Sequence, residues 1–195
     1  MVPDVRQARL ALFAALAALG LLSSACDRSN AVAAASTRAR TTEAPSTTEA
    51  PQPAGKDPSH IAKMVCAAEA QAEMARVLGV RARVRTPTWS DDLYTCRYAY
   101  PNGSFLLSVK ELSSWAQTLG YFHSLGASMG DTGSLGNLGQ GAFTTSDGSV
   151  VVRKDWKVLL VNIAPLPKEF GKPPTSKADV AYTVAAIILG CWDGD

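Results

Sequence analysis

Four cysteines carry the most distinctive chemistry in this sequence. They are Cys26, Cys66, Cys96 and Cys191. A thiol can be linked to a lipid, form a disulfide, or ligate a metal ion when histidines or further cysteines stand at ligand spacing. No standard metal-ligand spacing is present, so we predict neither a metal site nor another cofactor. Cys26 directly follows an apolar N-terminal stretch, and we therefore expect its role to differ from that of the other three.

The N-terminal segment has the three parts of an export signal, with a short basic head, an apolar stretch over residues 10–22, and small residues before Cys26. The apolar stretch is too short for a stable span, which needs roughly 20 apolar residues. The run from Leu21 to Cys26 is similar to a bacterial lipobox, in which Ala25 precedes the lipid-modified cysteine. We therefore predict a cleaved lipoprotein signal peptide, residues 1–25, and a lipid such as palmitate on Cys26.

This anchor would hold the chain on the extracytoplasmic face of the cell membrane. The alternative is an ordinary secretory signal cut within residues 31–35, which would give a secreted protein. The lipobox usually has Leu three residues before the cysteine, where this chain has Ser23. Asp27 and Arg28 favour the earlier boundary, because charges end an apolar core.

Composition divides the rest of the chain into two parts. Residues 26–57 hold the lipid-modified cysteine and a stretch dominated by Ala, Ser, Thr, Pro and Glu. Such a stretch cannot offset the entropy cost of folding, so we predict a disordered stalk, whose Ser and Thr are also candidate glycosylation sites. Residues 58–195 have the length of a single globular domain with its own core.

The balance of charge does not favour nucleic acid as a partner. The sequence has 19 Lys and Arg against 17 Asp and Glu, for a formal net charge of +2. A partner held through phosphates needs a concentrated basic face, and only Arg81, Arg83 and Arg85 approach one. This stripe could contact anionic lipid or wall phosphate. The simpler interpretation is the solvated face of an edge strand, where charges block aggregation.

Catalytic motifs are not found. A hydrolase triad needs a histidine as base, and the candidates His60 and His123 lie on predicted helices without a nucleophile in a recognisable pattern. Asp91 and Asp92 are typical of a turn. The glycine-rich residues 134–143 follow a predicted helix and precede a predicted strand, whereas a phosphate cradle needs the reverse. We interpret these glycines as turn and packing residues, and no catalytic residue is predicted.

Hydrophobic periodicity predicts the elements around these residues. Three helices are expected to begin at Asp57, Ser114 and Ser176, and the first two to end before Gly79 and Gly130. The apolar stripe expected on the first helix is Ile61, Met64, Val65, Ala68, Ala72 and Ala75.

Alternating residues predict a β-hairpin of residues 94–100 with 104–110. Two apolar runs on either side of a polar tip predict a second hairpin, of residues 150–153 with 158–163. The order helix-β-β-helix-β-β(-β)-helix predicts an α+β fold, with an antiparallel sheet of four to five strands and three helices packed on it.

An exported domain meets an oxidising environment, so Cys66, Cys96 and Cys191 are candidates for a disulfide. If Cys26 carries lipid, one bridge can form among them, and the residues alone leave three pairings open. Cys96 and Cys191 are both expected to face inward. The remaining thiol is expected to be buried and inert.

Several segments resemble those of small exported lipoproteins and secreted proteins of actinobacteria, a group without an established activity. The segments are Trp89–Tyr98 (with Tyr94-Thr95-Cys96-Arg97-Tyr98), Leu107–Glu111, Leu138–Phe143, Val150–Asp155 and Gly190–Trp192. Related actinobacterial lipoprotein domains join a first-helix cysteine to a cysteine of an early strand, which implies a bridge from Cys66 to Cys96, with Cys191 as an alternative partner. The resemblance implies no catalytic residues.

Two function hypotheses follow. The first is a membrane-anchored binding or interaction module at the cell envelope, which offers a sheet face or a sheet–helix cleft to a small apolar ligand, an envelope polymer or a protein partner. Trp89, Tyr100 and Trp156 lie near predicted turns and are candidate contact residues. The second is an envelope enzyme with an unrecognised active site, which no motif supports.

Overall fold

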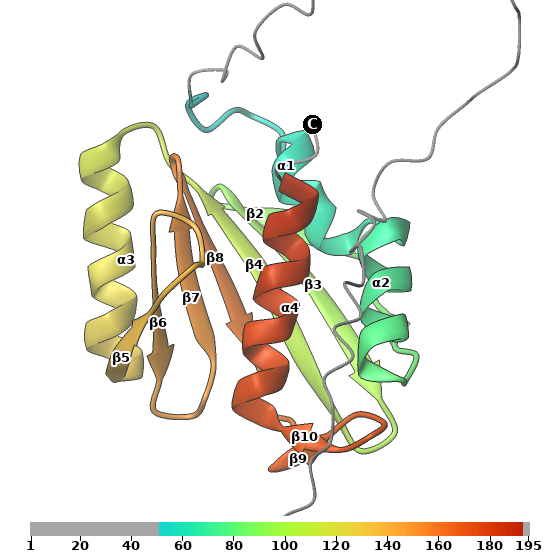
Figure 1. Cartoon of the computed structure of the whole chain (residues 1–195). Helices are drawn as coiled ribbons and strands as arrows, with labels where there is room; N and C mark the ends of the chain where they lie inside the picture. The colour runs from blue at the N-terminus through green and yellow to red at the C-terminus, as the bar shows by residue number, and fades with distance from the viewer. Residues whose placement is uncertain (1–50, 193–195) are drawn as a thin grey trace, which may run out of the picture.

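The structure, a computed structural model, describes residues 51–192. The predicted signal peptide, Cys26 and most of the predicted stalk lie outside these residues. An antiparallel sheet forms the centre, in the order β1-β3-β4-β8-β7-β6-β5, with β2 also paired to β3 (Figure 1). The strands are Arg83–Val84 (β1), Thr88–Ser90 (β2), Leu93–Tyr100 (β3), Gly103–Glu111 (β4), Asp131–Leu135 (β5), Gly141–Thr145 (β6), Val150–Lys154 (β7) and Lys157–Asn162 (β8). Two further strands, Glu169–Phe170 (β9) and Thr175–Ser176 (β10), pair with each other.

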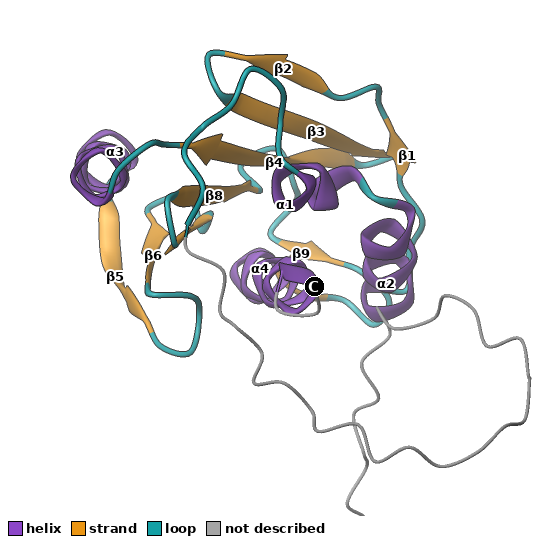
Figure 2. Cartoon of the chain, turned by 90° about the horizontal axis from the view of Figure 1, so that it is seen from above, coloured by secondary structure: helices purple, strands orange, loops and turns teal. Residues whose placement is uncertain are grey.

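Helices cover both faces of the sheet. They are α1 (His60–Lys63), a 3-10 turn (Met64–Cys66), α2 (Ala68–Leu78), α3 (Trp115–Met129) and α4 (Lys177–Trp192). Figure 2 shows α3 on one side of the twisted sheet and α1, α2 and α4 on the other. The α+β class is therefore confirmed, but within residues 51–192 the sheet has eight strands and there are four helices, more than predicted. The extra strands β1, β2 and β5 are short and largely exposed, so they lack the apolar alternation that identifies a strand.

Both predicted hairpins are present. β3 and β4 pair from Leu93 opposite Lys110 to Tyr100 opposite Gly103. β7 and β8 pair without interruption down to Lys154 opposite Lys157. β4 and β8 then lie side by side, so that the two hairpins form the middle of the sheet.

The core is divided between the two faces of the sheet because neighbouring side chains on a strand point in opposite directions. The larger part lies under α2 and α4, where Val150 and Val152 of β7 are fully enclosed. The smaller part lies under α3 and includes Val151, Phe122 and Phe143.

The first helix differs from the prediction in two ways. It begins after Ser59 rather than at Asp57, because the Ser59 hydroxyl accepts a hydrogen bond from the Ala62 N–H as N-cap. It also breaks at Ala67, whose backbone is extended (φ −64°, ψ 150°), so that α1 and the 3-10 turn are separated from α2. The predicted end of this region is correct, since Gly79 adopts the left-handed conformation that favours glycine (φ 65°).

A buried carboxylate explains why Ser59, and not Asp57, is the N-cap of α1. Glu111, at the end of β4, accepts hydrogen bonds from the Ser59 N–H (3.2 Å) and from the Ser59 hydroxyl. The Nζ of Lys157 lies 3.9 Å from the same carboxylate, and both charged side chains are almost fully enclosed. The start of α1 is thus attached to the middle of the sheet through its cap.

The two later helices begin as predicted. Ser114 caps α3 by accepting from the Gln117 N–H, and Ser176 accepts from the Asp179 N–H at the start of α4. Gly130 ends α3 in the left-handed region (φ 75°). None of the helices within residues 51–192 has the length and apolar character that crossing a bilayer requires.

The last residues of the predicted stalk contact the domain. The Ala54 N–H donates to the Leu112 carbonyl (3.1 Å), and the Trp89 indole donates to the Lys56 carbonyl (3.0 Å). The chain therefore joins the fold beside the end of β4 and the start of α3.

Candidate functional site

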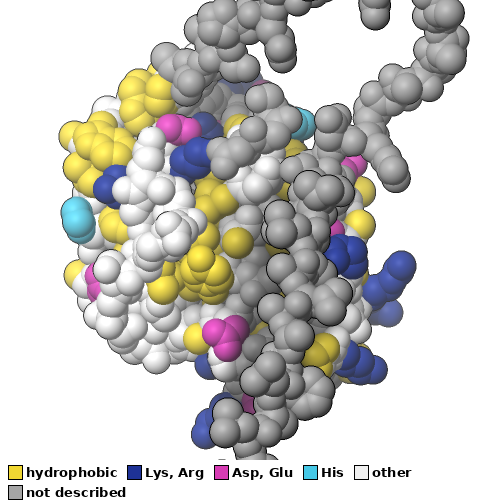
Figure 3. Space-filling model, in the orientation of Figure 1, with side chains coloured by type: hydrophobic (Ala, Val, Ile, Leu, Met, Phe, Trp, Pro, Cys, Tyr) yellow, Lys and Arg dark blue, Asp and Glu magenta, His cyan; other side chains and the backbone are white. Residues whose placement is uncertain are grey.

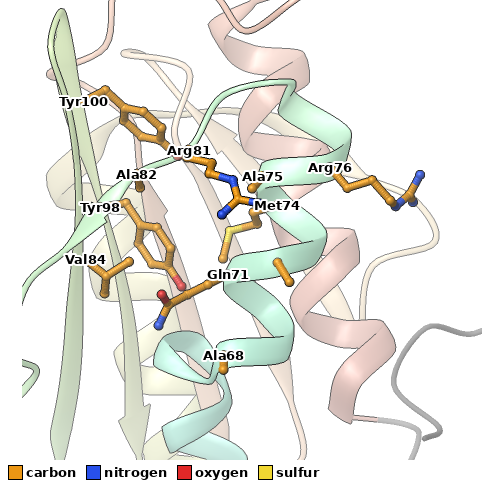
Figure 4. Close-up of a pocket in the computed structure, with 11 residues that line it drawn as sticks. Ala68, Gln71, Met74, Ala75, Arg76, Arg81, Ala82, Val84, Tyr98 and Tyr100 are labelled. Atoms are coloured by element: carbon orange, nitrogen blue, oxygen red, sulfur yellow. The ribbon is translucent and has the colours of Figure 1, made fainter.

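A groove of about 530 Å³ lies between α2 and the β1–β3 edge of the sheet. Figure 4 shows the side chains around it. Its walls are mostly small or apolar, with a few polar groups among them. The lining residues are Ala68, Gln71, Ala72, Met74, Ala75, Arg76, Arg81, Ala82, Val84, Tyr98 and Tyr100. A cavity of this size and mixed lining is typical of a small-ligand site.

The break at Ala67 gives this groove its alanine wall. An uninterrupted helix would bury Ala68, Ala72 and Ala75, as the sequence predicts. Instead the buried face of α2 is Ala70, Met74 and Leu78, and the three predicted core alanines line the groove. The predicted stripe is therefore wrong for α2. Because alanine has only a methyl group, this side of α2 does not fill the space towards β1, and the groove stays open.

The break is held by two contacts of Cys66. Its Sγ forms a disulfide with Cys96 of β3, with a Cα–Cα distance of 5.6 Å. Its carbonyl oxygen accepts a hydrogen bond from the Gln71 side chain (2.7 Å). This is the pairing that the actinobacterial resemblance implies, and Cys191 lies buried on α4 outside it. Cys96 faces inward as expected and is fully enclosed.

Arg81 supplies positive charge to the groove. Its side chain extends from the β1 side towards Met74 and Ala75, whereas Arg76 points away from the groove (Figure 4). Arg76 pairs with Glu73 on the same helix, and its hydrogen bond lowers the pKa of the Glu73 carboxyl. Arg81 forms no ion pair with any residue in the described part of the chain. Its charge is therefore available to an anion.

Two tyrosines form the sheet side of the groove. The Tyr98 hydroxyl donates a hydrogen bond to the Val65 carbonyl (2.7 Å), so its proton is not available to a ligand. The Tyr100 ring packs edge-on against Phe170, with 4.7 Å between ring centroids, and burial raises its pKa to about 12. Both phenols are neutral at physiological pH, and they contribute aromatic surface rather than charge.

A second hollow of about 480 Å³ adjoins the groove and shares Arg81, Ala82 and Tyr100 with it. Its remaining polar lining is Arg83 and Arg85. Neither arginine forms an ion pair within residues 51–192. The groove therefore opens onto a basic edge, and the combination fits an anionic head next to an apolar body.

The other candidate residues are not brought together. His60 lies on α1 and His123 on α3, on opposite faces of the sheet (Figure 2). Asp91 and Asp92 form the tight turn before β3, both with positive φ. Within residues 51–192, no three His, Cys, Asp or Glu side chains come close enough to hold a metal ion.

The predicted surface aromatics have different positions. Trp89 is held by its hydrogen bond to Lys56, and Trp156 is half-buried at the β7–β8 turn. Only Tyr100 lies in the groove. Arg81, which belongs to the basic stripe identified in the sequence, also lines the groove. The groove alanines were missed because alanines at helical spacing are typical of a buried helix face. The signal that could have identified them is the cysteine pair, since a bridge from Cys66 to a strand restricts the helix that follows.

The glycine-rich segment has a structural role, although its context differs from the one predicted. A strand, β5, lies between α3 and these glycines, and β6 follows them. A phosphate cradle requires a helix directly after the glycines, and no helix stands there. Gly139 lies against β7, where a Cβ atom would come within 2.6 Å of the Arg153 carbonyl oxygen.

Comparison with known proteins finds no family model that matches the chain, and no matching curated protein or solved structure. The case for a function therefore depends on the residues and on the geometry of the groove.

Proposed function

We propose that this chain is a lipoprotein of the extracytoplasmic side of a bacterial membrane, and that its folded domain binds an anionic amphiphile in the α2 groove. The observation that carries the binding role is the position of Arg81 in a groove lined with alanine, methionine and tyrosine side chains. The guanidinium would hold the anionic group of the ligand, and the alanine wall would contact its apolar part. Membership in the actinobacterial group of exported lipoproteins is part of the same proposal.

The pattern around Cys26 supports a lipid anchor, and residues 27–57 support a flexible spacer. A random coil of this length has an end-to-end distance of about 30 Å. The domain would therefore stay within tens of ångströms of the bilayer, where lipids are the abundant anionic amphiphiles. This proximity favours a lipid or a fatty acid over a soluble metabolite as the ligand.

The basic edge gives the ligand a direction of entry. Arg83 and Arg85 stand beside the groove without ion-pair partners in the described residues. They would attract a negatively charged headgroup before Arg81 binds it, which raises the rate of association at low ionic strength.

The anchor is tested by palmitate labelling in the producing bacterium. Labelling is expected to disappear in Cys26→Ser while the domain still folds. A label that persists in Cys26→Ser contradicts the anchor, and export of an unlabelled wild-type protein would favour the secreted alternative.

The binding role is tested by native mass spectrometry of the full chain extracted from its own membrane. We expect the wild-type protein to retain an anionic lipid-like ligand and Arg81→Glu to lose it. Arg97→Glu is the matched control, because Arg97 lies on the same edge of the sheet but bonds to Ser104 outside the groove. Equal retention by the wild type and Arg81→Glu would refute binding at this groove.

A further inference from the structure

A second cleft lies on the opposite face of the sheet, between α3 and strands β5 and β6. Its volume is about 570 Å³. The rings of Phe122 and Phe143 meet there edge to face, with 4.9 Å between their centroids. The cleft also contains a guanidinium, that of Arg153 from β7, and the carboxylate of Asp131 from β5. No part of the proposed lipid-binding role uses this face.

The Arg153 guanidinium lies over aromatic rings. Its Cζ is 4.6 Å from the centroid of the Trp115 ring and 5.6 Å from that of Phe122. The rings satisfy the positive charge at the faces of the guanidinium plane. They do not satisfy the N–H donors, which lie within the plane. Nη1 is shielded from solvent and has no hydrogen-bond partner in the described part of the chain.

Gly141 of β6 makes room for this arrangement. A Cβ atom at position 141 would lie 2.8 Å from Nε and 3.1 Å from Nη2 of Arg153. The φ angle of Gly141 is outside the left-handed region, so the backbone itself does not require glycine. The absence of a side chain at Gly141 therefore leaves room for the Arg153 guanidinium.

A buried donor without an acceptor costs folding free energy, and the cost is highest for a charged group. The cost is removed when an anion accepts the hydrogen bond. A carboxylate matches the guanidinium fork, because its two oxygens can accept from two N–H groups. A dianion such as phosphate is more strongly disfavoured than a monocarboxylate, since Asp131 places a negative charge in the same cleft.

We propose that the α3 cleft is a second binding site, in which Arg153 holds the carboxylate of a small aromatic or apolar monocarboxylic acid. Because Nη1 is shielded from solvent in the unliganded domain, a small outward shift of the flexible Arg153 side chain would accompany binding and let the acid group accept from Nη1. The apolar part would lie against Phe122 and Phe143. Trp115, which is 42 % exposed, would form the rim of the site above the guanidinium. This site is independent of the groove at Arg81.

Phenylacetate is the probe for this site, and 19F NMR is the readout. The four tryptophans of the full chain are labelled with 5-fluorotryptophan, and Trp115→Phe assigns the Trp115 resonance. Titration with millimolar phenylacetate is expected to shift this resonance saturably. Phenylacetamide, the neutral analogue, and inorganic phosphate are expected to shift it much less.

Three variants make the test specific. Arg153→Gln removes the charge, and Gly141→Ala keeps the charge but displaces the guanidinium. Each is expected to weaken phenylacetate binding by about tenfold or more, which is the effect of losing roughly one charge-assisted hydrogen bond. Arg81→Gln is the control and should bind as the wild type does. Unchanged resonances of the other tryptophans show that each variant is folded.

The proposal is overturned if the wild type shows no saturable shift, or if phenylacetamide binds as well as phenylacetate. It is also overturned if folded Gly141→Ala and folded Arg153→Gln both retain wild-type affinity. If Arg153→Gln does not fold, Gly141→Ala alone decides the question.

Discussion

The side-chain amide of Gln71 donates a hydrogen bond to the carbonyl oxygen of Cys66 across 2.7 Å, and this bond connects the disulfide with the groove. The Cys66 carbonyl has lost its helical partner, because the backbone turns away from the helix at Ala67. Gln71 replaces that partner from the first turn of α2. The position of α2, and so the width of the groove, depends on a disulfide that fixes the preceding turn to β3.

Removal of the disulfide is therefore expected to lower stability. The Cys66→Ser, Cys96→Ser double variant should lose about 3–4 kcal/mol of unfolding free energy, because the bridge closes a loop with a sequence separation of 30. Chemical denaturation measures the loss. A reductant should destabilise the wild type by a similar amount and leave the double variant unchanged. A variant as stable as the wild type would show that the bridge does not fix the turn.

The buried pair between Glu111 and Lys157 gives a second prediction. Glu111→Ala should destabilise the domain by about 3–5 kcal/mol, because it leaves the Lys157 ammonium and the Ser59 donors without their acceptor. The Glu111→Gln, Lys157→Met double variant should be much more stable than Glu111→Ala, since it removes both charges and keeps an oxygen for Ser59. Urea unfolding of the three proteins tests this. If the double variant is no more stable than Glu111→Ala, the unpaired charge of Lys157 is not the cause of the destabilisation.

Groove geometry predicts effects of different size at two alanines that are two residues apart on α2. Ala70 is fully enclosed in the core, whereas Ala72 lines the groove. Ala70→Leu should cost about 1–3 kcal/mol through overpacking, and Ala72→Leu should change stability by less than about 0.5 kcal/mol. Thermal unfolding separates the two. Greater destabilisation by Ala72→Leu than by Ala70→Leu would mean that α2 has the rotational phase of an unbroken helix.

Alkaline pH should destabilise the domain in part through Tyr100. Burial raises its pKa to about 12, above the ordinary value of 10. The folded state therefore keeps the proton that the unfolded state loses, and stability falls as the pH rises from 10 towards 12. Tyr100→Phe should show a smaller fall, because phenylalanine has no proton to lose. Unfolding midpoints measured below and above pH 10 test this, and parallel curves for the two proteins would argue against it.

Much of the fold can be predicted from the sequence where burial alternates regularly. β3 and β4 have apolar residues at every second position, so their pairing can be predicted from the sequence. β7 and β8 are instead continuous apolar runs buried on both faces, and their pairing can be predicted from the short polar turn between them. The helix caps Ser114 and Ser176 can be predicted from the sequence because their hydrogen bonds join residues three positions apart. β5 cannot be predicted in this way, because four of its five residues are exposed and it exists only through pairing with β6.

The candidate sites depend on contacts between distant residues, which a local pattern does not contain. Ser59 replaces Asp57 as the cap because Glu111, far along the chain, binds it. The groove lies beside a helix break at Ala67, next to Cys66, whose disulfide partner Cys96 is 30 residues away in the chain. Arg153 follows three valines in β7, and this buried strand is the one local indication of an enclosed guanidinium.

The most direct test of the account is native mass spectrometry of wild-type and Ala72→Leu proteins, purified in parallel from the membrane of the producing bacterium. The added isobutyl side chain fills the groove without changing its charge. We expect the wild type to carry an anionic amphiphile and Ala72→Leu, equally stable and equally anchored, to carry much less. A wild-type protein without a ligand, or a ligand retained equally by both proteins, would contradict a binding site between α2 and the β1–β3 edge.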